Sequence, residues 1–474
     1  MRNRIYTAVA GCFMVFFLFI AGCSQESKPA MSSMVIADDE KDPAVWGRKY
    51  PNQYDSYMQN EQRSTGFSKY RTAAQCRLTP WPFQFVLYDG WGFGKEYNDP
   101  NGHTEMMRDQ QKIDPSRKKA GGVCLTCKTP YAPELRERLK IEYFQRPYEE
   151  VLKEIPEKHR QMGVICADCH DPATMSLRIN RITLIESLKA IGKDPDKLTR
   201  QELRSLVCAQ CHVDYSIPKD SEGKSSGLLF PWKNGKWGDI KIEHVIQQIK
   251  DDNLLEWKHK ITGQKMGHLR HPEFELYSSP GSVHWAAGVA CADCHMPYER
   301  VGREKISSHR WDSPVRRGMR ACTQCHPQGA DWLKEQVLNI QDRVNHMFTK
   351  AGYIIAQAAL MIEAADKLPG VDQGLMKRAK ELYQEAYYRN VWIGAENSMG
   401  FHNPPEALRV LGDAVDYGRQ AESSAKEAII KTGGSPPELD TAKIDQYVAQ
   451  TYKTTDGKTG FKPDIQRKAA LLVQ

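Results

Sequence analysis

The clearest pattern of apolar and polar positions lies in the last third of the chain. From Leu333 to Met361, apolar residues recur at alternating steps of four and three, with charged residues between them. This spacing puts the apolar side chains on one helix face, as a seam sustained for four heptads. We expect the helix to begin near Asp331, which could cap it, and to end at Pro369 and Gly370. The seam predicts packing against another helix, either of the same chain or of a second copy.

Two further helices are expected after this one. The first runs from about Val371 to Ile393, and the second from about Pro404 to Thr432, because proline suits the first turn of a helix and Gly433 follows its end. The last forty residues are polar, and one or two short helices are expected there. Residues 328–474 are therefore predicted to form a C-terminal helical region that also serves dimerisation.

The segment before the first cysteine pair has a different character. Residues 44–120 are rich in Pro, Gly, Tyr and Trp, and no helical period is sustained. This composition predicts loops with short helices. Cys76 lies alone in this segment, and no role is assigned to it.

The N-terminal residues have the features of an export signal. Arg2 and Arg4 precede an apolar stretch of signal-peptide length, which ends at Gly22 and Cys23. This ending resembles a lipoprotein signal, in which the cysteine becomes the first mature residue and carries lipid. We expect residues 1–22 to be a lipoprotein-type signal peptide, residues 23–43 a flexible tether, and the protein to be periplasmic and anchored at the membrane surface through Cys23. An ordinary cleaved signal and an uncleaved anchor remain alternatives.

Composition and charge narrow the function classes. The chain has 474 residues, 40% of them hydrophobic, and a mean hydropathy of −0.61, as expected of a water-soluble mature protein. The formal net charge is +7, or +5 without Arg2 and Arg4 (7 − 2). No basic run with interleaved aromatic residues is present, so nucleic-acid binding is excluded. The modest positive balance favours a small anionic substrate.

Ten of the 13 cysteines form five C-x-x-C pairs, and these pairs carry the chemistry. In four pairs a histidine follows the second cysteine, which is the signature of covalent c-type haem attachment. The thiols bond to the haem, and the histidine becomes an axial ligand of the iron. The four motifs are Cys166, Cys169 and His170; Cys208, Cys211 and His212; Cys291, Cys294 and His295; and Cys322, Cys325 and His326.

The first pair, Cys124 and Cys127, is followed by Lys128 instead of histidine. The set therefore predicts five covalently bound haems, one of them chemically different. Zinc and redox dithiols are the alternatives for C-x-x-C pairs. Zinc is disfavoured because two pairs per metal would leave one pair over, and because a histidine directly after the second cysteine is not zinc-ribbon spacing.

The number of histidines available as axial ligands bears on whether the protein is an enzyme or an electron carrier. Of 14 histidines, four lie in the motifs and ten remain to supply distal ligands. Four distal histidines would close four irons, whereas the iron bound to Lys128 could keep one face open. Lysine ligates only as the neutral amine, so the metal and burial must lower its pKa. If one iron has a free coordination position and receives electrons from four six-coordinate irons, the protein is predicted to be an enzyme. If every iron is six-coordinate, it is predicted to be an electron carrier.

On these motifs the sequence resembles the pentahaem cytochrome c nitrite reductases, the ammonia-forming (NrfA) family. The shared features are the lysine motif before four C-x-x-C-H motifs, the signal peptide, the His-Val-Asp-Tyr run at 212–215, the His-Pro-Glu run at 271–273, and the helical C-terminus. The resemblance covers nearly all of the mature chain. It implies a mainly α multihaem fold, with a loop-rich catalytic region at residues 44–327 and a C-terminal bundle of long helices.

The resemblance also implies an activity and its residues. The activity is the dissimilatory six-electron reduction of nitrite to ammonium at the haem whose proximal ligand is Lys128. Tyr215 and His271 match the distal tyrosine and histidine of the family. Where the family has its distal arginine, alignment gives a proline; Arg117, two residues on, is our choice, with Arg108 as the second candidate. The implied distal haem ligands are His309 for the second haem, His103 for the third, His402 for the fourth and His284 for the fifth.

One position departs from the family pattern. The family commonly binds calcium beside the active site, and the matching positions here read Asp214, Tyr215, His268 and Arg270. An arginine in place of the usual glutamine puts a cation where a cation is bound, so we expect Arg270 to replace calcium and to pair with Asp214, as in a calcium-independent branch. The alternative is that calcium binds through poorer ligands.

Other functions and partners remain open on sequence alone. A non-catalytic multihaem electron carrier is one alternative, and a multihaem reductase of hydroxylamine, sulfite or tetrathionate is another. The resemblance implies nitrite as substrate, a homodimer, and an electron donor that is either a membrane-bound quinol dehydrogenase or a small cytochrome.

Overall fold

The structure is a computed structural model. The expected signal peptide, most of the expected tether including Cys23, and the last residues of the chain lie outside the described residues. From Ile36 onward the described residues belong to one compact unit. The structure describes residues 34–61, 69–70, 76–98, 100–118 and 121–452.

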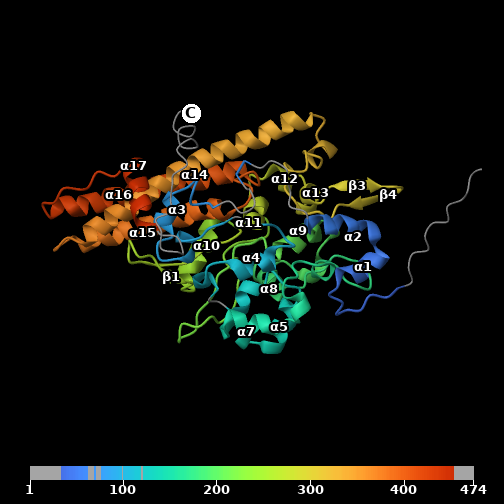
Figure 1. Cartoon of the computed structure of the whole chain (residues 1–474). Helices are drawn as coiled ribbons and strands as arrows, with labels where there is room; N and C mark the ends of the chain where they lie inside the picture. Colours follow the sequence, from blue (N-terminus) through green and yellow to red (C-terminus); the bar gives the residue numbers. More distant parts are fainter. Residues whose placement is uncertain (1–33, 62–68, 71–75, 99, 119–120, 453–474) are drawn as a thin grey trace, which may run out of the picture. The chain divides into compact units, whose positions relative to one another are not determined.

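Three long helices form the C-terminal bundle, and they lie side by side in orange to red in Figure 1. They are α14 (Ala330–Asp366), α15 (Gln373–Ala395) and α16 (Pro404–Lys431). A shorter helix, α17 (Thr441–Thr451), packs against α14. The bounds agree with the three long helices expected from the periodicity. The mainly α fold is confirmed.

The apolar seam of α14 is buried within the chain. From Val344 onward its side chains pack against α15 and α16, whereas Leu333 and Val337 pack against Met319. The stretch from Ala351 to Leu360 is buried on every side. Packing inside one chain thus accounts for much of the seam, and the dimer interface stays a prediction. The start of the helix differs from expectation: its N-cap is Gly329, and Asp331 lies inside the first turn. A carboxylate there still favours the helix, because it faces the positive end of the helix dipole.

The bundle is joined to the N-terminal part of the chain through α3 (Phe83–Leu87). Gly352 on α14 lets the two helices approach, because a Cβ atom there would lie 2.1 Å from the Phe83 ring. Beside it the Trp81 indole donates a hydrogen bond of 2.9 Å to the buried Asn345 side chain. The loop-rich region is therefore fixed on the surface of the bundle.

Short helices and loops make up most of the rest of the described residues, as the sequence predicts. Two small antiparallel hairpins accompany them, β1 (Trp257–Lys258) with β2 (Lys265–Met266) and β3 (Tyr298–Val301) with β4 (Glu304–Ser307). The other α-helices are α1 (Pro43–Lys49), α2 (Pro51–Met58), α4 (Met106–Lys112), α5 (Ala132–Leu139), α6 (Glu142–Gln145), α7 (Tyr148–Lys153), α8 (Ile182–Ala190), α9 (Arg200–Ala209), α10 (Ile242–Asp251), α11 (Glu273–Ser278), α12 (Val283–Ala286) and α13 (Cys291–His295).

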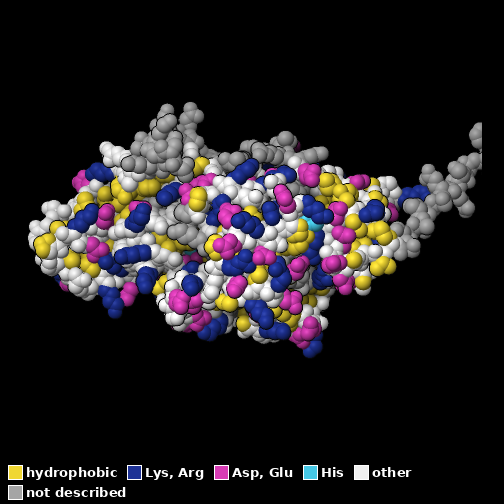
Figure 2. Space-filling view, turned by 60° about the horizontal axis from the view of Figure 1, so that its bottom comes forward, with side chains coloured by type: hydrophobic (Ala, Val, Ile, Leu, Met, Phe, Trp, Pro, Cys, Tyr) yellow, Lys and Arg dark blue, Asp and Glu magenta, His cyan; other side chains and the backbone are white. Residues whose placement is uncertain are grey.

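On the face drawn in Figure 2, basic and acidic side chains are interspersed, without a broad region of one sign. Among the described residues, no helix is both long enough and apolar enough to cross a membrane.

Candidate functional site

Each C-x-x-C-H motif lies on a short helical turn, which brings its thiols and its imidazole to one side. The backbone N–H of His170 donates to the carbonyl of Cys166 at 2.9 Å, and His326 does the same to Cys322. The equivalent bond in the third motif measures 3.0 Å. The spacing of the motif thus becomes a local geometry suited to attaching one flat group through two sulfurs and one nitrogen.

Four pairs of histidine rings face each other, one pair at each C-x-x-C-H motif. In the third motif the Nε2 atoms of His212 and His103 lie 3.5 Å apart. An iron held between two nitrogens at about 2 Å each needs about 4 Å between them, so this spacing fits a bis-histidine iron. The distances between ring centroids are 6.1 Å for His170 and His309, 5.7 Å for His212 and His103, 6.4 Å for His295 and His402, and 6.2 Å for His326 and His284.

The outer nitrogen of several of these rings is held by a hydrogen-bond partner. Nδ1 of His170 lies 2.9 Å from the carbonyl of Met175, and Nδ1 of His309 lies 2.9 Å from the carbonyl of Ser307. Such contacts orient a ligating imidazole and leave Nε2 free to face the metal. The four pairs are the ones expected from sequence, and their role as ligands stays a prediction.

His402 is held by a charged partner instead. Its Nδ1 lies 2.6 Å from Oε1 of Glu396, which is fully buried. Burial alone lowers the pKa of His402, but the Glu396 carboxylate outweighs it, so the pKa lies above its ordinary value. The same carboxylate accepts from the backbone N–H groups of Ser398 and Gly400 at 2.8 and 3.0 Å. This network orders the turn that carries His402.

The comparisons with known proteins agree with this arrangement. The sequence model of the cytochrome c552 family matches residues 42–470. This chain belongs to the cytochrome c552 family. Membership implies covalently bound c-type haem, in agreement with the motif geometry.

Curated relatives in the family have similar lengths. The cytochrome c nitrite reductase subunit NrfA of Nitratidesulfovibrio vulgaris is 33% identical over 449 residues, which span 86% of this chain and 84% of the relative. Cytochrome c-552 of Bacteroides fragilis is 30% identical, spanning 90% of this chain and 83% of the relative. A solved structure of the NrfA subunit from Desulfovibrio desulfuricans superposes with a TM-score of 0.76 at 28% identity, over 90% of this chain and 97% of that one.

Within this member of the cytochrome c552 family, the motifs adjoin one another. The Cys127 thiol lies 4.0 Å from the carbonyl oxygen of Gln210, which places the first motif beside the third. The backbone N–H of Cys291 donates to the Ser205 hydroxyl at 3.2 Å, which places the fourth motif beside the helix that carries the third. Flat cofactors attached at such neighbouring sites would lie close to one another.

The lysine motif has its own surroundings. Cys124 lies in a 3-10 turn, Gly121–Leu125, and the backbone N–H of Lys128 donates to the carbonyl of Leu125 at 2.9 Å. Lys128 is among the charged groups that act on His271, whose ring lies 6.5 Å from that of His212. His271 has a backbone φ of +54°, in the region that favours glycine, and its side chain is 50% exposed. A residue held in a strained conformation beside a cofactor motif is a candidate for function.

The two candidate arginines lie in different places. Arg108 is exposed on α4, where it pairs with Glu105 at 2.7 Å and donates to Gln161 at 3.2 Å. Arg117 lies in the 3-10 turn Pro115–Arg117, close enough to Tyr215 for the two to interact electrostatically, and burial lowers the pKa of its guanidinium. Burial also raises the pKa of the Tyr215 phenol, so this side chain holds its proton. The geometry therefore favours Arg117 as the arginine of the site.

The arginine expected to replace calcium has a different partner from the one expected. The Arg270 guanidinium forms a two-pronged ion pair with Glu256, at 2.6 and 2.9 Å, and donates to the carbonyl of Tyr215 at 3.0 Å. Asp214 instead accepts the backbone N–H of Arg270 at 2.6 Å. The long side chain of Arg270 reaches past Asp214 to Glu256, and only Oδ1 of Asp214 is bonded to the Arg270 backbone. Burial by itself lowers the pKa of Arg270. The ion pair with Glu256 outweighs burial, so the pKa lies above its ordinary value.

Sequence reasoning missed Glu256 and also passed over Glu273. Glu273 lies in the His-Pro-Glu run, and its carboxylate lies 3.6 Å from Nδ1 of His212 and 4.0 Å from Nδ1 of His271. Burial raises its pKa, but the neighbouring His212 outweighs burial and holds it at about 2. The run itself was a signal for Glu273, whereas Glu256 stands in a loop without a motif.

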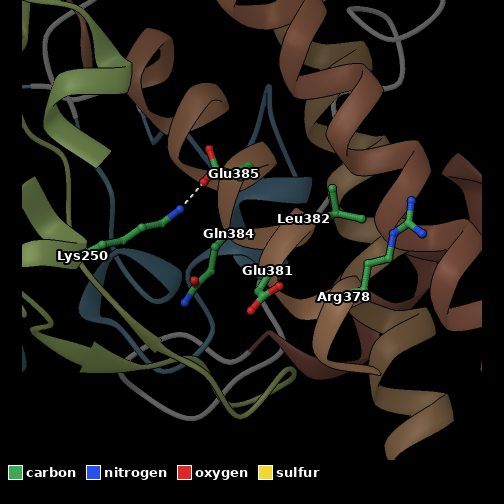
Figure 3. A pocket seen from close by; sticks show the side chains of 6 residues that line it. All are labelled: Lys250, Arg378, Glu381, Leu382, Gln384 and Glu385. Carbon is green, nitrogen blue, oxygen red and sulfur yellow. Dashed lines mark hydrogen bonds and ion pairs between the residues drawn. The ribbon is translucent and has the colours of Figure 1, made fainter. Parts of the chain in front are cut away.

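Two surface pockets lie apart from the histidine pairs. One, of about 440 Å³, lies between α10 and α15 and is lined by Lys250, Glu385 and four neighbours (Figure 3). It contains none of the predicted site residues. The other, of about 450 Å³, is bordered by Cys76, Lys95 and Glu96, on the outer side of the loop that contacts Arg117. Among the described residues, no group of three or more His, Cys, Asp and Glu side chains could hold a metal ion by itself.

Proposed function

We propose that this protein is an ammonia-forming cytochrome c nitrite reductase. The observation that carries the proposal is an asymmetry. Four cysteine motifs end in a histidine whose ring lies close to that of a second histidine, whereas the remaining motif ends in Lys128. The charge of Lys128 acts on His271, and the two cysteines of the same motif act on Tyr215. The NrfA subunits similar to this chain are named cytochrome c nitrite reductases. The substrate is nitrite and the product is ammonium, after six electrons are transferred.

The ligand sets follow from the facing pairs. The first haem takes Cys124, Cys127 and Lys128, with an open distal face. The other four take their motif cysteines and two histidines each, which leaves them suited to electron transfer only. The axial pairs are His170 with His309, His212 with His103, His295 with His402 and His326 with His284.

The residues around the open face of the first haem have different roles. A haem iron bound there supplies an open coordination site and a source of electrons. Arg117 donates hydrogen bonds to the oxygens of the anion, for which a guanidinium is well suited. His271 and Tyr215 hold and pass the protons that the reduction consumes, and Tyr215 remains protonated because burial raises its pKa. The positive charge of Arg117 also stabilises negative charge as it develops on the substrate.

Arg270 takes the place that calcium has in much of the family. Its guanidinium binds the carbonyl of Tyr215, at 3.0 Å, and so fixes the backbone beside the active tyrosine. Glu256 neutralises it there. Metal analysis of chelator-treated, active enzyme tests this: stoichiometric calcium in the active protein would contradict it.

The setting of the enzyme is proposed from its N-terminus and its family. The mature protein is periplasmic, is anchored through a lipid on Cys23, and forms a homodimer through the helical region. Its electron donor is a quinol dehydrogenase or a small cytochrome. The mass of the mature N-terminal peptide tests the lipid, because a diacylglycerol-modified Cys23 would be heavier than a simple cleavage product.

Turnover of nitrite with a reduced viologen as donor tests the function. We expect ammonium to be formed in an amount equal to the nitrite consumed. Nitrite loss without ammonium would mean an incomplete reduction. No loss by fully haem-loaded protein would favour the carrier, or a reductase of hydroxylamine, sulfite or tetrathionate. Replacing Lys128 by leucine should abolish ammonium formation, whereas replacing the exposed Arg108 by leucine should leave it within about two-fold.

A further inference from the structure

Arg117 is held mainly by an aromatic ring. Among the described residues, its guanidinium makes one hydrogen bond. Nη1 donates to the carbonyl oxygen of Glu96, and the bond is long at 3.3 Å. Its Cζ atom lies only 4.0 Å from the centroid of the Phe93 ring. This is well inside the range of about 6 Å over which a cation is attracted to the face of an aromatic ring.

The Phe93 ring is itself fixed from several sides. The ring of His268 stacks on it, with centroids 4.9 Å apart and planes 25° apart. Tyr97 meets it edge-on at 4.8 Å. The backbone around it has little freedom, because Gly94 is buried and a Cβ there would lie 2.8 Å from the carbonyl oxygen of Tyr88. Phe93 is therefore a rigid platform rather than a mobile side chain.

His268 packs against this platform. Its side chain is 2% exposed, and it packs among the rings of Phe93 and Trp91. Burial, together with the charges of Arg270 and Arg117, lowers the pKa of His268 well below its ordinary value. A neutral imidazole repels neither guanidinium group.

Trp91, two residues before Phe93, lies near a second arginine, Arg270. Cζ of Arg270 lies 6.0 Å from the Trp91 ring and 4.7 Å from the Tyr215 ring. Trp91 and Phe93 come from one short segment around a 3-10 turn, Gly92–Gly94. This segment, which we call the aromatic clamp (Trp91 and Phe93), thus contacts Arg117 and Arg270 at once.

We propose that Phe93 is a positioning residue for Arg117. Its ring face, backed by His268, sets the place of the guanidinium relative to Tyr215 and His271, and so the place at which the anion meets it. The inference rests on the proposed function, because it concerns the binding of nitrite. A residue that merely filled space could be replaced by any apolar side chain of similar size, whereas a platform for a cation needs an aromatic face.

Substitutions that keep the volume but remove the ring face separate these two roles. Phe93→Leu and Phe93→Met are expected to weaken nitrite binding to the oxidised, fully haem-loaded enzyme by roughly five- to ten-fold, and to raise KM more than they lower kcat. Phe93→Tyr keeps the ring face and should stay within about two-fold. Binding is followed by titrating nitrite against the haem absorbance. Tyr298→Leu is the control, because Tyr298 also carries a cation, Lys305 at 4.4 Å, on an exposed hairpin.

A double-mutant cycle shows whether Phe93 acts through Arg117. In an Arg117→Leu background, Phe93→Leu should weaken nitrite binding by less than about two-fold, because the guanidinium it positions is gone. Equal losses in both backgrounds would overturn the proposal. So would unchanged affinity in the Leu and Met variants, or failure of both to take up haem while Phe93→Tyr is fully loaded. If the unsubstituted enzyme bound no nitrite, the proposed function itself would fail, and this outcome is distinct from the others.

Discussion

At the scale of single residues, the site depends on how buried charges are paired. Arg270 and Glu256 are 8% and 2% exposed in their side chains, and their ion pair is doubly hydrogen-bonded. Burying the two charges costs desolvation free energy, which the doubly hydrogen-bonded geometry offsets. Removing one partner leaves the other charge buried without compensation. The sequence pointed to Arg270 but could not name Glu256, because the two meet only when the β1–β2 hairpin forms between them.

Removing the Arg270 guanidinium should therefore destabilise the protein strongly. Arg270→Gln is expected to lower the free energy of unfolding by about 3–5 kcal/mol, because the buried carboxylate of Glu256 loses its cationic partner. Chemical denaturation of the haem-loaded protein, with tryptophan fluorescence as the probe, measures the change.

A matched surface variant and a double variant sharpen this test. Arg138→Gln breaks an exposed pair with Glu154 and should cost less than about 1 kcal/mol. Replacing both buried partners, Arg270 and Glu256, by glutamine should recover part of the loss. A loss for Arg270→Gln no larger than that for Arg138→Gln would contradict the assignment of a structural cation to this position.

At the scale of elements, the long helices position everything else. Helices α14, α15 and α16 were predictable because their apolar positions repeat with the period of the helix. Their contact with α3 was not, since it depends on a single small residue, Gly352, under the Phe83 ring. Glycine normally weakens a helix, so its place here is explained by the close approach.

Two glycine substitutions should have opposite effects on stability. Gly352→Ala is expected to destabilise the protein by about 1–3 kcal/mol, because the new methyl group would lie 2.1 Å from the Phe83 ring. Gly412→Ala on α16 meets no atom within 4 Å and should stabilise it by about 0.5–1 kcal/mol through helix propensity. Thermal unfolding of both variants decides, and stabilisation by Gly352→Ala would show that α3 does not pack as described.

At the scale of the whole molecule, the proposed function needs one open iron among closed ones. The facing rings come from distant parts of the chain, such as His103 and His212, which are 109 residues apart. Each pair joins a motif to a separate segment, so the array exists only in the folded chain. The first motif lies beside the third, and the fourth lies beside the helix that carries the third.

Removing one distal histidine should open a second iron. The oxidised protein is expected to show one high-spin haem, and His309→Ala should add another, because His170 would lose the ring that faces it. Electron paramagnetic resonance measures this. His346→Ala is the control, since this histidine is exposed on α14 and pairs with no motif. An unchanged spectrum for His309→Ala would remove it from the ligand set.

The sequence by itself determined what is encoded locally. Five C-x-x-C pairs, the residue that follows each, and the helical periods lie within one or two turns of chain, so their chemistry and structure can be read without the fold. Resemblance to a family extended this to the distal histidines and to Arg270.

Only the tertiary structure decided which groups meet. It placed Arg117 rather than Arg108 beside Tyr215, gave Arg270 the partner Glu256, and turned the seam of α14 toward its own chain. It also put Phe93 under Arg117. These contacts join segments whose spacing along the chain follows no period. They arise because burying a charge or an apolar face requires a partner from elsewhere in the fold.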